Sequence, residues 1–64
     1  MEDAQLTQLE RKVEQLRKIQ PVLRALYEEL WEEGQTDEAE AILVALVRVR
    51  AALVAEEQRL YAAR

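Results

Sequence analysis

Residues 41–55, Ala-Ile-Leu-Val-Ala-Leu-Val-Arg-Val-Arg-Ala-Ala-Leu-Val-Ala, decide the fold of this 64-residue chain. Only Arg48 and Arg50 interrupt the apolar side chains of this stretch. A helix that is apolar on nearly every side has to be buried on more than one side. One partner helix covers a single side, so the stretch predicts an assembly larger than one chain.

The composition leaves self-association as the main means of stabilising so short a chain. Small domains bury little surface and rely on a metal, on disulfides or on oligomerisation. The sequence contains no Cys, which excludes disulfides and thiolate metal sites, and no His, the commonest metal ligand and general base. Ser is also absent, and there is no glycine-rich loop to bind phosphate. We therefore expect no enzymatic activity, no cofactor and no metal site.

The amino-acid alphabet is narrow and rich in helix formers. Ala, Leu, Glu, Arg and Gln dominate, as in coiled coils and long helical hairpins. A GC-rich or thermophilic genome gives such a composition, and so does de novo design. The N-terminus lacks the basic and apolar regions of a signal peptide, and residues 41–55 are too short to span a bilayer. We expect a soluble, cytoplasmic protein, or a recombinant soluble one if it is designed, with no membrane partner.

Residues 3–33 are predicted to form one long amphipathic helix, with Asp3 or Thr7 as the candidate N-cap. Positions that alternate spacings of three and four residues form a heptad seam: Leu6, Leu9, Val13, Leu16, Gln20, Leu23, Tyr27 and Leu30. Ile19 and Leu26 adjoin this seam and are predicted to widen it.

Pro21 conflicts with this helix locally. Proline inside a helix removes one hydrogen bond and pushes against the carbonyl four residues earlier, here that of Arg17, at a cost of about 3 kcal/mol. The apolar seam nevertheless keeps its register from Leu16 to Leu23. The pattern therefore predicts a continuous helix that is kinked near Pro21, and two separate helices are the alternative.

A turn at residues 34–36 connects this helix to a second one at residues 37–63. Gly34 is predicted to end the first helix as a left-handed residue, and Thr36 or Asp37 to cap the second. Because the connection is so short, the two helices must run antiparallel. The expected fold class is all-α, a helical hairpin.

The second helix carries two apolar stripes side by side. Its seam is formed by Ala39, Ile42, Leu46, Val49, Leu53 and Leu60. The second stripe is formed by Leu43, Val47, Val54 and Tyr61. Together the stripes are wider than one partner helix requires, so the seam suits the first helix and the second stripe needs another surface. The predicted residues of a self-association interface are Leu43, Val47, Arg50, Val54 and Tyr61.

Charged residues lie beside both stripes of the second helix. Arg50 and Glu57 lie between the stripes and are predicted to pair across an interface. Glu56 lies on the seam itself, where it is predicted to mark the end of the core, because burying a carboxylate is costly.

Charge is also segregated along the hairpin. Residues 25–40 hold seven of the 13 acidic residues and none of the nine basic residues. An antiparallel dimer places each acidic loop end beside the basic termini of the other copy, whereas a parallel dimer brings two acidic ends together. The single domain, residues 1–64, is therefore predicted to form an antiparallel four-helix bundle homodimer, with a trimer or tetramer left open.

Residues 8–16, Gln-Leu-Glu-Arg-Lys-Val-Glu-Gln-Leu, resemble the opening of the leucine zipper in basic-zipper transcription factors. Leu9, Val13 and Leu16 fall on its heptad positions, and Gln20 matches the polar residue that sets the register of such zippers. The resemblance implies a coiled-coil seam, with a parallel zipper through the first helix as a minor alternative. No basic region precedes these residues and the net charge is −4, so nucleic acid is not an expected partner.

Two further resemblances concern the hairpin. Its length and plan are similar to those of the plasmid RNA-regulator Rop, a homodimeric antiparallel bundle, but the RNA-contacting face of that family has no counterpart here. Residues 31–34, Trp-Glu-Glu-Gly, are similar to the Trp-x-Gly turn of small secreted helical hairpins, with the spacing off by one. Both imply a helical hairpin, and neither assigns an activity.

The leading functional hypothesis is a structural or oligomerisation module, natural or designed, whose partner is itself. The alternative is a small acidic adaptor or inhibitor that binds another protein through the second stripe or the acidic loop end. Tyr27 and Trp31, near this end, are the candidate partner anchors. The simpler interpretation, which we favour, places Tyr27 in the seam and Trp31 over the end of the bundle.

Overall fold

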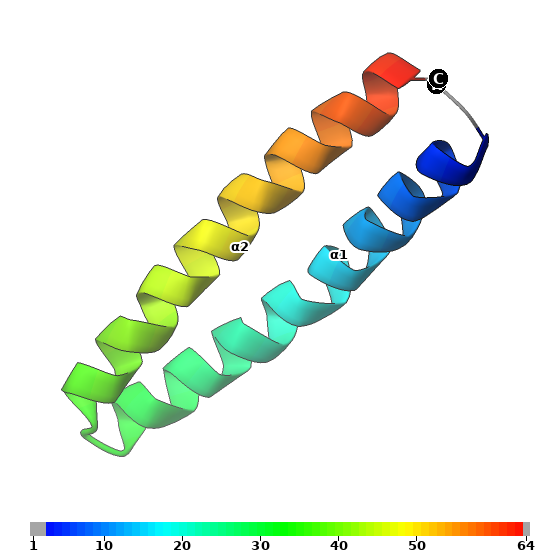
Figure 1. Ribbon diagram of the computed structural model, residues 1–64. Coiled ribbons are helices and arrows are strands. Elements are labelled where there is room, and N and C mark those ends of the chain that lie inside the picture. The colour runs from blue at the N-terminus through cyan, green and yellow to red at the C-terminus, as the bar shows by residue number, and fades with distance from the viewer. Residues whose placement is uncertain (1–2, 64) are drawn as a thin grey trace.

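The computed structural model describes residues 3–63, which form two long helices packed against each other as a hairpin (Figure 1). Helix α1 comprises Asp3–Glu32 and helix α2 comprises Thr36–Ala63. The helices run antiparallel, with the loop at one end of the molecule and both ends of the described chain at the other (Figure 1). The predicted all-α helical hairpin is confirmed.

The end of α1 is built by the backbone of the loop. Gly34 has a φ of 77°, the left-handed conformation predicted for it. The N–H of Gln35 donates to the carbonyl of Leu30 at 3.0 Å, and the N–H of Gly34 donates to the carbonyl of Trp31 at 3.1 Å. These two bonds make up a Schellman motif, which satisfies carbonyls at the end of a helix that would otherwise lack partners.

The structure corrects the predicted N-cap of α2 and excludes Thr7 as the N-cap of α1. The carbonyl of Gln35 accepts the first hydrogen bond of α2, from Ala39 at 2.9 Å, so Gln35 occupies the cap position in place of Thr36 or Asp37. The reason is the tightness of the turn, which leaves a single residue between Gly34 and the helix. In α1, Thr7 lies inside the helix, where its Oγ1 donates to the carbonyl of Asp3 at 2.9 Å.

Helix α1 continues through Pro21 without interruption, so the alternative of two separate helices is wrong. The seam residues on both sides of Pro21 face the same helix, α2, and a break would cost their shared burial. Tertiary packing therefore outweighs the hydrogen bond that proline removes.

The predicted seams face each other. Within α1, the residues that are buried or half-buried are the predicted seam positions and no others, and every predicted seam residue of α2 is also buried or half-buried. Toward the open end of the hairpin, Leu6 and Leu16 pack against a buried cluster: Leu9, Val13, Leu53 and Leu60.

The hairpin is elongated and leaves much of its surface open. It measures 48 × 14 × 12 Å and has a radius of gyration of 14.7 Å, whereas a compact domain of this length has about 11 Å. Its accessible surface is 5138 Å², and a compact monomer of 7.5 kDa exposes about 4,200 Å². The surplus of about 900 Å² arises because each helix is covered by one neighbour only.

Candidate interaction surface

The residues predicted for self-association lie on the surface of the hairpin. We call Leu43, Val47, Arg50, Val54 and Tyr61 the α2 stripe. All five are exposed, with exposed fractions of 60% for Val47, 49% for Val54 and 86% for Tyr61. Packing within residues 3–63 leaves a large part of each of these side chains exposed, including 39% of Leu43.

The α2 stripe lies on the face of the hairpin where Arg17 pairs with Glu57. Their Nη2–Oε2 distance is 2.6 Å, and the pair bridges α1 and α2. Leu43, Arg50 and Glu57 follow one another at heptad spacing and therefore share this face. A groove of about 410 Å³ opens on the same face, lined by Gln20, Pro21, Arg24, Leu46 and Arg50.

A second group of exposed apolar residues, which we call the α1 stripe, lies on the opposite face. It consists of Ile19, Val22 and Leu26, with exposed fractions of 43%, 66% and 38%. Ile19 and Leu26 continue the heptad line of Lys12, which bridges to Glu56 across the other side of the seam. The prediction that Ile19 and Leu26 widen the seam is therefore wrong, because α2 is too narrow to cover them.

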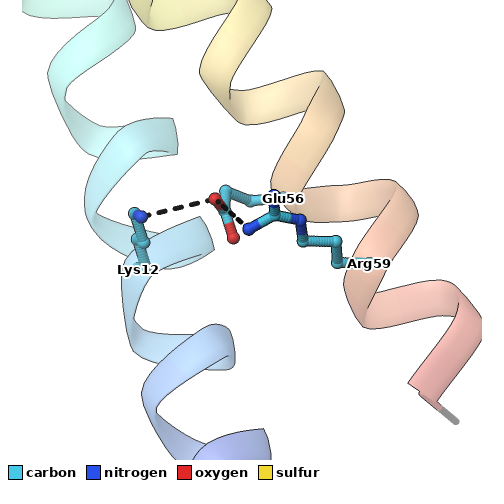
Figure 2. A network of polar contacts seen from close by, with 3 residues as sticks. All are labelled: Lys12, Glu56 and Arg59. Carbon is cyan, nitrogen blue, oxygen red and sulfur yellow. Dashed lines mark hydrogen bonds and ion pairs between the residues drawn. The ribbon is translucent and has the colours of Figure 1, made fainter.

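Glu56 is buried within the seam and held by two bases (Figure 2). Its side chain is 10% exposed, and its Oε1 lies 3.3 Å from Nζ of Lys12 and 3.4 Å from Nη1 of Arg59. The prediction that the core ends at Glu56 is wrong, since Leu60 beyond it is buried. The carboxylate is tolerated because both bases approach it from the edge of the seam and keep their own charges largely in water.

The partner of Glu57 within the chain is Arg17, a contact that the sequence did not indicate. Arg50, the other residue of the predicted interface pair, makes no ion pair with any residue from 3 to 63. The sequence marks both residues as flanking the seam, but only the rotation of α1 against α2 selects Arg17 as the neighbour of Glu57.

The two candidate anchor residues lie in the last turns of α1, beside the acidic loop. Tyr27 is half-buried at its seam position, whereas Trp31 is 56% exposed. Their rings stack, with centroids 6.4 Å apart and planes inclined by 24°. Trp31 therefore covers Tyr27 from the solvent side and leaves its own outer face in water.

Among the described residues, no group of three or more His, Cys, Asp or Glu side chains is arranged to hold a metal ion. Neither helix, over the same residues, has the length and apolar character needed to cross a membrane. Comparison of the chain with protein families, curated proteins and solved structures finds no match.

Proposed function

We propose that the chain is a non-enzymatic, self-associating module with a structural role, in which two hairpins form an antiparallel four-helix bundle homodimer. The observation that supports this proposal is the exposed α2 stripe, where apolar side chains recur at the heptad spacing that a further helix recognises. A monomer with this stripe in water exposes apolar surface that association removes.

The surplus surface has the size that a dimer requires. If each chain buries its surplus of about 900 Å² against the other, the interface totals about 1,800 Å². Stable protein–protein interfaces bury about 1,200–2,000 Å² in total. The hairpin therefore has enough uncovered surface for one standard interface.

A kink of α1 near Pro21 is part of this proposal. Pro21 has no N–H to donate to the carbonyl of Arg17, so the helix bends away from its proline side. The groove beside Pro21, between the two helices, supports such a bend. A second hairpin would cover this groove from the α2 stripe side.

The test compares Val54→Glu with Val44→Glu. Both valines lie on α2 and are about half exposed, at 49% and 51%, but Val44 lies outside the α2 stripe. Sedimentation across a dilution series, with helicity followed by circular dichroism, should show a dimer for the unchanged chain and for Val44→Glu. Val54→Glu should be monomeric and lose most of its helicity, because one hairpin has only a narrow core. A folded, soluble monomer from Val54→Glu, or from the unchanged chain, would refute the proposal.

The exposure of Trp31 favours a second candidate function, an acidic adaptor or inhibitor for another protein. In this role the loop end docks on a basic partner surface, with Trp31 as the apolar anchor. Trp31 is the single tryptophan of the chain, so its fluorescence reports on docking directly. A cationic helical peptide should shift its emission with an affinity that falls as salt rises. An emission that does not change on addition of the peptide would argue against this function.

A further inference from the structure

From Val47 to Tyr61, the apolar residues of the α2 stripe and the charged residues Arg50 and Glu57 are arranged almost symmetrically about one point of α2. Val47, Val54 and Tyr61 follow one another at heptad spacing, so Val54 is the central apolar residue. Arg50 and Glu57 flank this line on the side of α1, and the point midway between them lies between Leu53 and Val54. In a pair of identical antiparallel helices, each residue faces the residue of the other copy that lies equally far on the opposite side of the two-fold axis. A pattern that is symmetric about one point of the helix is therefore complementary to itself.

Arg50 and Glu57 differ in the ion pairs that they make within the hairpin. Arg50 is exposed and makes no ion pair with residues 3–63. Glu57 is paired with Arg17, but its side chain remains 39% exposed. A carboxylate has lone pairs for a second guanidinium, so Glu57 retains capacity for another arginine that approaches from solvent.

We propose that the occupant of the α2 stripe is a second copy of this chain, docked antiparallel with the two-fold axis at Val54, so that Arg50 of each copy binds Glu57 of the other. This inference rests on the self-association proposed above and adds the register in which the two α2 helices align. The carboxylate of Glu57 then lies between Arg17 of its own chain and Arg50 of the second copy.

Charge disfavours the two simpler registers. Arg50 lies at the middle of α2 (Thr36–Ala63), so two fully overlapped antiparallel helices would bring Arg50 against its own copy. A parallel pair would do the same and would also place the two acidic loop ends side by side. Moving the axis by about four residues, or about 6 Å along α2, replaces this repulsion with two Arg–Glu contacts. The acidic loop end of each hairpin then projects past the C-terminal end of the other copy.

Disulfide formation measures this register directly. The chain has no Cys, so a single introduced cysteine reports on one position only. With the axis at Val54, two Val54→Cys chains place their cysteines opposite each other, within the Cα separation of about 7 Å that a disulfide allows. Two Val47→Cys chains place theirs about 20 Å apart, because each lies a heptad from the axis. Mild oxidation should therefore cross-link Val54→Cys and leave Val47→Cys uncross-linked.

A charge exchange provides the second measurement and leaves the apolar residues of the α2 stripe unchanged. Arg50→Glu alone and Glu57→Arg alone each produce a homodimer with two like-charged contacts. Mixing the two chains produces a heterodimer with two oppositely charged contacts, while the contact of position 57 with Arg17 is the same in both kinds of dimer. Random pairing gives as much heterodimer as the two homodimers together, whereas native mass spectrometry of the mixture should find roughly ten times more heterodimer than homodimer.

The outcomes separate this register from self-association itself. An unchanged chain that sediments as a monomer overturns both proposals. A dimer in which Val47→Cys cross-links as readily as Val54→Cys, or in which neither cross-links, overturns the register alone. Random pairing of the two charge variants in a dimeric protein likewise overturns the Arg50–Glu57 contact and leaves self-association standing.

Discussion

Replacing Glu56 by leucine should stabilise the protein, although it removes two ion pairs. The carboxylate occupies a seam position between buried Leu53 and Leu60, and only 10% of its side chain is exposed. Leucine has a similar volume, and burying it contributes about 1.5–3 kcal/mol. Lys12 and Arg59 keep 60% and 70% of their side chains exposed, so they are solvated again at little cost. After about 1 kcal/mol is subtracted for the lost pairs, the net gain is about 0.5–2 kcal/mol.

Removing the bases should have the opposite effect. In the double variant Lys12→Ala and Arg59→Ala, the carboxylate of Glu56 stays buried without a compensating charge, which costs about 2–3 kcal/mol. The matched control is Lys18→Ala with Arg24→Ala. It also removes one lysine and one arginine, but their carboxylate partners are more than 60% exposed. The control should change stability by about 1 kcal/mol or less.

The assay is urea unfolding followed by circular dichroism, at one fixed chain concentration because the stability of an associating chain depends on concentration. The midpoint should rise for Glu56→Leu, fall for the variant without Lys12 and Arg59, and move little for the control. If Glu56→Leu destabilises the chain, or if loss of the two bases costs no more than the control, Glu56 is not a desolvated charge and the reasoning is refuted.

Three further changes test the local structure by the same assay. Gly34→Ala should lower the free energy of unfolding by about 1 kcal/mol, because a φ of 77° is strained for alanine. The strain comes from the backbone alone, since no atom lies within 4 Å of the added Cβ. An unchanged midpoint would contradict the left-handed turn. Val13→Ala should lower the free energy of unfolding by about 2 kcal/mol, since Val13 is 1% exposed. Val44→Ala should change it by less than about 0.5 kcal/mol, because Val44 is half exposed. Equal effects of the two changes would place the core elsewhere. Pro21→Ala should stabilise by about 1–3 kcal/mol, because it restores a donor inside α1, and a loss of stability would show that the proline geometry itself is needed.

The sequence was sufficient to predict the elements of the fold and the inward side of each helix. Heptad spacing identified the α1 residues that α2 covers, from Leu6 to Leu30, because helical periodicity is a local property of the chain. The turn was equally local, since Gly34 supplies the left-handed conformation and the short connection forces an antiparallel return. The exposure of Val47 and Val54 followed as well, because one neighbouring helix cannot cover two stripes.

The tertiary structure decided which residues meet beside the seam. Glu57 pairs with Arg17, Glu56 is buried between Lys12 and Arg59, and Ile19 lies on the face opposite the α2 stripe. These outcomes depend on the rotation and register of α1 against α2, which are set by the packing of both seams together. The periodicity of one helix states which of its sides is apolar, but it contains no information about the phase of the other helix. For this reason the hairpin could be predicted from the sequence, whereas its two distinct faces could not.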